Sequence, residues 1–376
     1  MYKNYDLLNK ALKKKNLSEI IEFYSSKLPK KEIFVCEDIS ITYQDLDNKI
    51  NKVCNYFEKL KLKKKDVVSL YLQNSIEYII FYFAVIRYGA IVSPIPYGLN
   101  ENRLRYYLKI SNSKLLISNI NYSLKKIKNI IILNYQDFEK QIENFKINFI
   151  SPKLKPEDTC IYYFSSGTTA NPKLIKYSNL AMINCQKILF NSNFLKINST
   201  HLCILPLGHT ASLRYSIKNA ILGQGKVYIY KNFWQIKHKI WKIIETKKIN
   251  FVGVVPSIIE TISQIYKKRK KIRHLKFIGC GSSILSEELQ KKFKKKYNVT
   301  VKNIYGMSEI GVATIDDPSS NKIYGTIGKK LKGVEVNLFN EKGVKIIKEN
   351  SIGEICVKTP ALFSGYKSKI IKNDKK

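Results

Sequence analysis

The sequence contains little arginine and few histidines, although it is strongly basic. Only six of its 66 basic residues are arginine, four residues are histidine, and the formal net charge is +37. Nucleic-acid sites rely on arginine for bidentate contacts and gather their charge on one face. The lysines are instead scattered along the whole chain. We therefore expect nonspecific adhesion to polyanions at low salt and no specific nucleic-acid site.

Paired cysteines and long apolar runs are also missing. The seven cysteines lie far apart and none forms a C-x-x-C pair, so neither a zinc site nor a disulfide framework is indicated. The first residues lack the apolar stretch of a signal peptide, and the most apolar segment, residues 78–85, is too short to span a bilayer. We expect a reduced, cytoplasmic protein without a transmembrane segment.

Length and periodicity predict an α/β fold. The 376 residues, 44% of them hydrophobic, allow two or three units that each bury a core. Thr42 and Asp45 have the spacing of a capping box, and apolar residues follow at helical intervals. Helical and strand-like segments then alternate up to about residue 304, and short apolar runs separated by glycines follow. We expect two layered α/β subdomains and a small, incomplete β-barrel-like subdomain with a polar tail, at residues 1–150, 151–305 and 306–376.

The most distinctive segment is the loop at residues 165–173. The stretch from 163 reads Tyr-Phe-Ser-Ser-Gly-Thr-Thr-Ala-Asn-Pro-Lys, and the apolar run at 161–164 predicts a buried strand that opens into it. Glycine allows backbone N–H groups to converge on an anion, and the hydroxyls and Lys173 add donors and charge. The loop does not match a Walker motif. The order of its residues favours a phosphate-binding loop over the alternative, a polar surface turn.

This loop closely resembles the signature loop of the adenylate-forming enzymes. That family includes acyl- and aryl-CoA synthetases, luciferases and the adenylation domains of peptide synthetases. Further segments resemble the family's motifs and follow in the family's order: residues 42–43, 66–90, 94–96, 205–209, 281–283, 305–309, 325–328, 353–355 and 365–366. The resemblance covers nearly the whole chain.

The resemblance implies attack by a carboxylate on the α-phosphate of ATP, which gives an acyl-adenylate and pyrophosphate. Because both reactants are anions, the site must neutralise charge and hold them in line. The resemblance assigns the β/γ-phosphates to the loop with Lys173, the α-phosphate to Ser308 and Mg²⁺ to Glu309, and these three residues are the catalytic candidates. The implied ATP-binding residues are Ser165, Ser166, Gly167, Thr168, Thr169, Lys173, Gly281, Ser282, Ser283, Tyr305, Gly306, Met307 and Ser308. His209 and Gly281 would line the substrate pocket.

Some positions depart from the family's pattern or have a simpler explanation. Ala170 and Leu174 stand where the family usually has glycine, and Ser308 replaces the commoner threonine. Residues 281–283 could form a plain turn between a strand and a helix. Single histidines are commonly structural, so we assign no functional role to His201.

The sequence contains no Thr-Gly-Asp, the family's ribose-binding motif, and ends shortly after Tyr366. The family continues into a mobile C-terminal domain that carries a catalytic lysine. We therefore expect an acyl- or aryl-CoA synthetase-like ligase truncated before that domain, with ATP, Mg²⁺ and CoA as a possible second substrate. A separate C-terminal ligase domain or an acyl carrier protein is a possible partner. The alternatives are a non-catalytic nucleotide- or acyl-binding protein and one chain of a split ligase.

The segment 208–213 bears on the substrate. Amino-acid-activating relatives usually place an aspartate there to hold the α-ammonium group, whereas Gly-His-Thr-Ala-Ser-Leu contains no acid. We therefore expect a small carboxylic acid without an α-ammonium group, either acyl or aryl.

Overall fold

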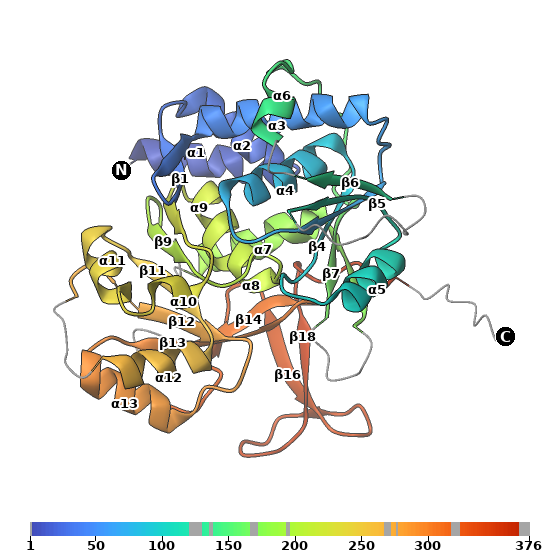
Figure 1. Cartoon of the computed structure of the whole chain (residues 1–376). Helices are drawn as coiled ribbons and strands as arrows, with labels where there is room; N and C mark the ends of the chain where they lie inside the picture. The colour runs from blue at the N-terminus through green and yellow to red at the C-terminus, as the bar shows by residue number, and fades with distance from the viewer. Residues whose placement is uncertain are drawn as a thin grey trace.

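The computed structural model describes residues 2–119, 130–134, 138–165, 172–192, 196–266, 272–275, 277–316 and 324–367. Within these ranges the chain forms two large sheets with helices around them and one small sheet near the C-terminal end (Figure 1). The α/β fold that the sequence predicts is confirmed.

The first large sheet carries the strand that leads into the 165–173 loop. Its strands are β3 (Val67–Tyr71), β4 (Ile91–Pro94), β5 (Ser113–Ser118), β6 (Ile131–Asn134), β7 (Thr159–Phe164) and β8 (Leu174–Ser178). Their order is β6-β5-β3-β4-β7-β8, and only β7 and β8 pair antiparallel. Every residue of β3 and β4 is buried, as expected for central parallel strands that are covered on both faces.

The second large sheet has the order β15-β14-β13-β12-β11-β9-β10-β1-β2. Its strands are β1 (Glu32–Cys36), β2 (Ile39–Thr42), β9 (Thr200–Cys203), β10 (Lys226–Ile229), β11 (Phe251–Val254), β12 (Phe277–Gly281), β13 (Val301–Met307), β14 (Gly311–Ile315) and β15 (Lys329–Lys330). The strands from β13 to β1 run parallel, and β2, β14 and β15 are antiparallel edges. Both large sheets draw strands from either side of residue 150, since β7 and β8 complete the first and β1 and β2 complete the second.

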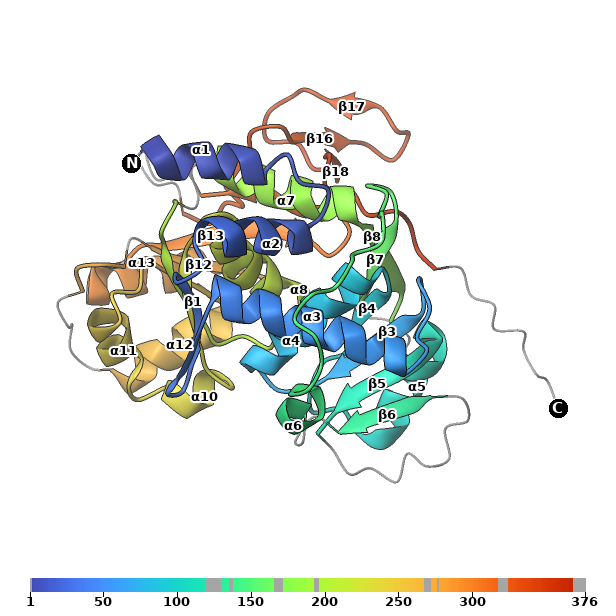
Figure 2. The same cartoon turned by 90° about the horizontal axis from the view of Figure 1, so that it is seen from above.

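The small β unit is a three-stranded antiparallel sheet that stands away from the rest of the molecule (Figures 1 and 2). It contains β16 (Glu335–Phe339), β17 (Lys345–Ile346) and β18 (Glu354–Lys358), in the order β17-β16-β18. The described strands form an open sheet and not a closed barrel.

The helices begin and end largely where their sequences dictate. They are α1 (Tyr2–Ala11), α2 (Leu17–Lys27), α3 (Tyr43–Lys59), α4 (Ile76–Tyr88), α5 (Glu101–Ser111), α6 (Phe138–Ile142), α7 (Asn179–Asn191), α8 (Thr210–Ser212), the π-helix η3 (Leu213–Lys218), α9 (Asn219–Leu222), α10 (Phe233–Ile236), α11 (Ile240–Thr246), α12 (Pro256–Ile265) and α13 (Glu287–Tyr297). The predicted capping box of Thr42 and Asp45 starts α3. Ser75 caps α4, which is buried almost all round, and Gly89 ends it with φ +81°. None of the described helices is both long and apolar enough to traverse a bilayer.

Candidate functional site

The ends of the predicted phosphate loop are held together by its two flanking strands. The Ser165 N–H donates to the Lys173 carbonyl at 2.9 Å, and the Lys173 N–H donates to Ser165 Oγ at 2.9 Å. This closure follows from the antiparallel pairing of β7 and β8. Ser166, Gly167, Thr168 and Thr169 lie outside the described residues, so their contacts with phosphate stay a prediction.

Two further predicted segments meet at the carboxyl ends of parallel strands. Gly281 ends β12 and pairs with Ile304 of β13, so residues 281–283 lie beside Tyr305. A Cβ on Gly281 would come within 2.6 Å of the Ile304 carbonyl oxygen, so only glycine allows this strand spacing. Ser282 and Ser283 are exposed just beyond. Ligands of α/β folds commonly bind at such carboxyl ends, which supports the predicted adenine position.

The turn after β13 carries the predicted α-phosphate and metal residues. Gly306 lies at an irregularity between β13 and β14, where a Cβ would come within 2.2 Å of the Gly311 carbonyl oxygen. Met307 is half exposed, and Ser308 and Glu309 are partly buried.

The segment 363–367 joins this turn to the phosphate loop. Tyr366 forms an antiparallel bridge with Ile175 of β8, flanked by two backbone hydrogen bonds to that strand, from Lys176 N–H to Gly365 O at 3.0 Å and from Lys367 N–H to Leu174 O at 2.9 Å. The Phe363 N–H donates to the Glu309 carbonyl oxygen at 2.8 Å. One short segment is therefore bonded both to the first large sheet and to the turn that leaves the second.

Lys173 and Glu309 meet at the side chain of Tyr366. The Lys173 ammonium lies over the Tyr366 ring, 5.2 Å from its centroid. The Tyr366 hydroxyl donates to Glu309 Oε1 at 3.1 Å. The pKa of Tyr366 is raised, first by partial burial and then by the negative charge of Glu309. The fold thus brings together two residues that the sequence analysis took from different motifs.

His209 lies in a different part of the site. It is exposed, it precedes α8, and its side chain makes no hydrogen bond to another described residue. The segment before it is fixed by Asn74, whose amide donates to Leu205 O at 2.9 Å and accepts from Leu207 N–H at 2.7 Å. Asn74 was not among the predicted site residues, because its type and position also suit a helix start, a role that Ser75 fills.

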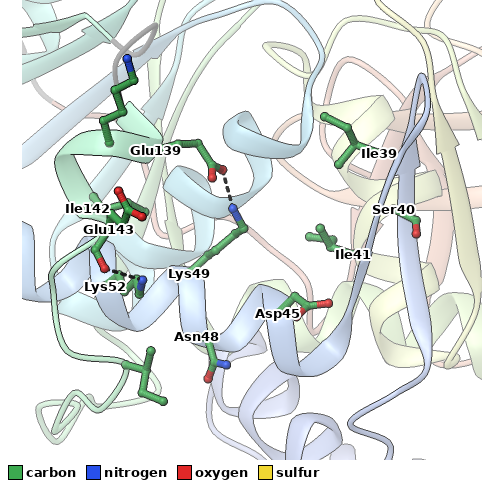
Figure 3. A pocket seen from close by; sticks show the side chains of 12 residues that line it. Ile39, Ser40, Ile41, Asp45, Asn48, Lys49, Lys52, Glu139, Ile142 and Glu143 are labelled. Carbon is green, nitrogen blue, oxygen red and sulfur yellow. Dashed lines mark hydrogen bonds and ion pairs between the residues drawn. The ribbon is translucent and has the colours of Figure 1, made fainter.

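A cavity of about 590 Å³ lies away from these residues, between β2, α3 and α6 (Figure 3). Its lining includes the ion pair of Lys49 with Glu139 and a hydrogen bond from Lys52 to the Glu143 carbonyl oxygen at 2.8 Å. None of the predicted site residues within the described ranges lines it. Its lining carries both acidic and basic side chains, and one of each, Lys49 and Glu139, forms an ion pair.

The charged residues present fit a magnesium ion that arrives with a nucleotide. In the described ranges, no three His, Cys, Asp or Glu side chains gather as an all-protein metal site. Mg²⁺ is usually held by one or two carboxylates together with substrate phosphates. Glu309, a partly buried carboxylate at the strand ends, is of the type that this arrangement needs.

The fold is that of the large N-terminal domain of adenylate-forming enzymes. ATP-bound MatB from Rhodopseudomonas palustris aligns with a TM-score of 0.84 at 20% identity, over 93% of this chain and 72% of that one. The family model for AMP-binding enzymes matches residues 22–367. The chain therefore belongs to the AMP-binding enzyme family.

The curated relatives differ widely in length. The chain is 25% identical to 4-coumarate–CoA ligase 4 of Arabidopsis thaliana, over 87% of this chain and 62% of that protein. It is 24% identical to tyrocidine synthase 3 of Brevibacillus parabrevis, over 94% of this chain and 5% of that protein. The chain thus spans less than two thirds of either relative.

Proposed function

We propose that this protein activates a carboxylic acid with MgATP to form an acyl-adenylate, as the first step of an acyl- or aryl-CoA synthetase reaction. One observation carries the proposal: Lys173 and Glu309 contact the same side chain, Tyr366, although Lys173 precedes β8 of the first large sheet and Glu309 follows β13 of the second. A cation and a carboxylate placed this close are what a polyphosphate and its metal ion require.

Each residue of the site has a role in this reaction. Lys173 and the hydroxyls of the 165–169 segment bind the β- and γ-phosphates, and the Ser308 hydroxyl donates to the α-phosphate. Glu309 holds Mg²⁺, which neutralises phosphate charge when bound. Residues 281–283 and 305–307 enclose the adenine, where the aromatic ring of Tyr305 suits a flat base.

The charges that follow His209 in the sequence favour a substrate acid without an α-ammonium group. No acidic residue occurs in 208–213, and a buried cation, Arg214, follows. Arg214 donates to the Gly311 carbonyl oxygen at 3.0 Å, so its charge lies next to the strand that follows Glu309. A substrate ammonium group beside residues 208–213 would meet the positive charge of Arg214, and these residues offer it no carboxylate. Gly281, the last residue of β12, would line the same substrate pocket.

The acceptor and the partners belong to the same proposal. CoA or an acyl carrier protein takes the acyl group, and a C-terminal ligase domain, supplied in the same or a separate chain, completes the reaction. A cytoplasmic location rests on the seven cysteines, all of which are free thiols.

The test is ATP–pyrophosphate exchange over a panel of fatty, aromatic, dicarboxylic and amino acids, with and without a separate C-terminal ligase domain. We expect exchange with an acid that lacks an α-ammonium group, and faster exchange when the C-terminal domain is added. Exchange with standard amino acids only would contradict the substrate class. MgATP binding without exchange under every condition would instead support the non-catalytic alternative.

A further inference from the structure

Tyr366 separates the two charged residues of the proposed nucleotide site. Its ring lies under the Lys173 ammonium and its hydroxyl binds Glu309 Oε1. Both charged side chains are partly or fully open to solvent. They do not form an ion pair with each other, although each contacts the same tyrosine.

The position of Tyr366 is fixed by its neighbours. The bridge to β8 holds its backbone, and the Phe363 ring packs edge-on against its ring at 4.9 Å between centroids. On its other side, the Lys367 ammonium donates to the Ser111 carbonyl oxygen at 3.0 Å. Because contacts on both sides hold the segment, the ring remains where it is in the absence of a ligand.

Removing the ring would change the state of the free site. A lysine and a glutamate that face each other across a small gap attract and form an ion pair. An ammonium group paired in that way has fewer free donors for phosphate, and the paired carboxylate has fewer free oxygens for Mg²⁺. A nucleotide would then have to break the pair before it could bind.

We propose that Tyr366 is a positioning residue that keeps Lys173 and Glu309 apart and so keeps both available to MgATP. The ring gives the ammonium a favourable contact that phosphate can replace, and the hydroxyl occupies only one carboxylate oxygen. This proposal rests on the proposed function, because it assigns the two charges to a nucleotide.

The test is a double-mutant cycle on the binding of ATP without metal, measured by calorimetry in the presence of EDTA. Of the two charged residues, only Lys173 should attract metal-free ATP, since Glu309 then has no ion to hold. We expect Tyr366→Ala to weaken binding about tenfold. Glu309→Gln should improve binding only slightly in the wild type, and about tenfold in the Tyr366→Ala background, because it frees Lys173 from the new ion pair.

Two further variants separate the ring from the hydroxyl. Tyr366→Phe keeps the ring and should bind metal-free ATP nearly as well as the wild type. Tyr366→Leu keeps the bulk of the side chain without an aromatic face. It should respond to Glu309→Gln as Tyr366→Ala does, and it replaces Tyr366→Ala in the cycle if the alanine variant folds poorly. Tyr228→Ala is the matched control, because Lys247 lies over that ring at 5.4 Å in another part of the molecule.

Equal effects of Glu309→Gln in both backgrounds would overturn the proposal. If Tyr366 only stabilised the fold, removing the charge of Glu309 would not restore ATP binding to Tyr366→Ala. A crystal structure of nucleotide-free Tyr366→Ala gives a second readout that needs no ATP. We expect Lys173 Nζ within ion-pair distance of a Glu309 oxygen, and charges that remain apart would also overturn the proposal. A wild type that binds no ATP, combined with an ion pair in the variant, would contradict the proposed function and leave the spacing role intact.

Discussion

The Lys218 ammonium donates a hydrogen bond to the Tyr163 hydroxyl at 3.0 Å inside the protein. The Tyr163 hydroxyl lies 3.1 Å from that of Tyr82, and both rings face the ammonium at 5.3–5.6 Å. No described carboxylate pairs with Lys218, and burial lowers its pKa to about 7. The interior therefore holds an amine that loses its proton near neutral pH.

Replacing Lys218 with methionine should stabilise the protein most at low pH. The unfolded chain binds this proton up to a pKa of ~10.4, whereas the folded chain releases it near pH 7. The contribution of Lys218 to the free energy of unfolding therefore rises with pH between about 7 and 10, by at most ~1.4 kcal/mol per pH unit. The advantage of Lys218→Met should be largest at pH 6.5 and smaller at pH 9, measured by urea unfolding.

The pH dependence of wild-type stability alone does not test Lys218, because buried thiols change the free energy of unfolding in the opposite direction. The wild type and Lys218→Met must therefore be compared. Burial raises the pKa of Cys203 to about 12, so the unfolded chain loses that proton first and stability falls at high pH. This contribution is present in both proteins and cancels in the difference. Lys292→Met, at an exposed position of α13, is the control. An advantage of Lys218→Met that does not change with pH would contradict the assignment.

Local signals account for most of what the sequence predicts correctly. The capping box at Thr42 and the apolar run before Ser165 act over a few residues, so they are visible in the chain itself. Lys218 is the opposite case, because its type predicts exposure, whereas it is buried against Tyr82, Tyr163 and Met182 from three other elements. The contacts of Tyr366 depend on pairing between distant segments, which periodicity does not reveal. The roles of the 166–169 hydroxyls and of His209 stay predictions.

A buried histidine should make the protein sensitive to acid. His201 lies in β9 with its ring edge-on to Phe251 at 5.5 Å, and burial lowers its pKa to about 4. Between pH 6.5 and 4 the unfolded chain binds a proton at His201 that the folded chain does not bind. The free energy of unfolding therefore falls as the pH is lowered through this range. His201→Phe should lose less thermal stability than the wild type between pH 7 and pH 5.

The exposed His238 provides the control for this experiment. His238→Phe should follow the wild type, because both proteins retain the buried imidazole. Carboxylates contribute to acid unfolding in all three proteins and cancel in the comparison. If His201→Phe and the wild type lose the same Tm on acidification, the buried imidazole is not the cause.

The two charged residues of the proposed site should each contribute to MgATP binding. Lys173→Ala removes the phosphate counter-charge, and Glu309→Gln removes the charged metal ligand. Charge-assisted contacts of this kind are worth ~1.5–3 kcal/mol, so each variant should bind MgATP about 10- to 150-fold more weakly by calorimetry. Lys187→Ala, on the neighbouring helix α7, should bind like the wild type. Unchanged affinity in both site variants would show that their proposed roles are wrong.

Gly281 tests whether the close approach of two strands positions the nucleotide site. In Gly281→Ala the new Cβ would lie 2.6 Å from the Ile304 carbonyl oxygen, a backbone atom that cannot move away alone. The substitution should separate β12 from β13, cost ~1–3 kcal/mol of unfolding free energy and weaken MgATP binding. Gly253→Ala, on the neighbouring strand β11, is the matched control because its Cβ would meet nothing closer than 3.7 Å. Its stability in thermal unfolding and its affinity for MgATP in calorimetry should both stay near those of the wild type. If the two variants behave alike, strand spacing at Gly281 does not control the site.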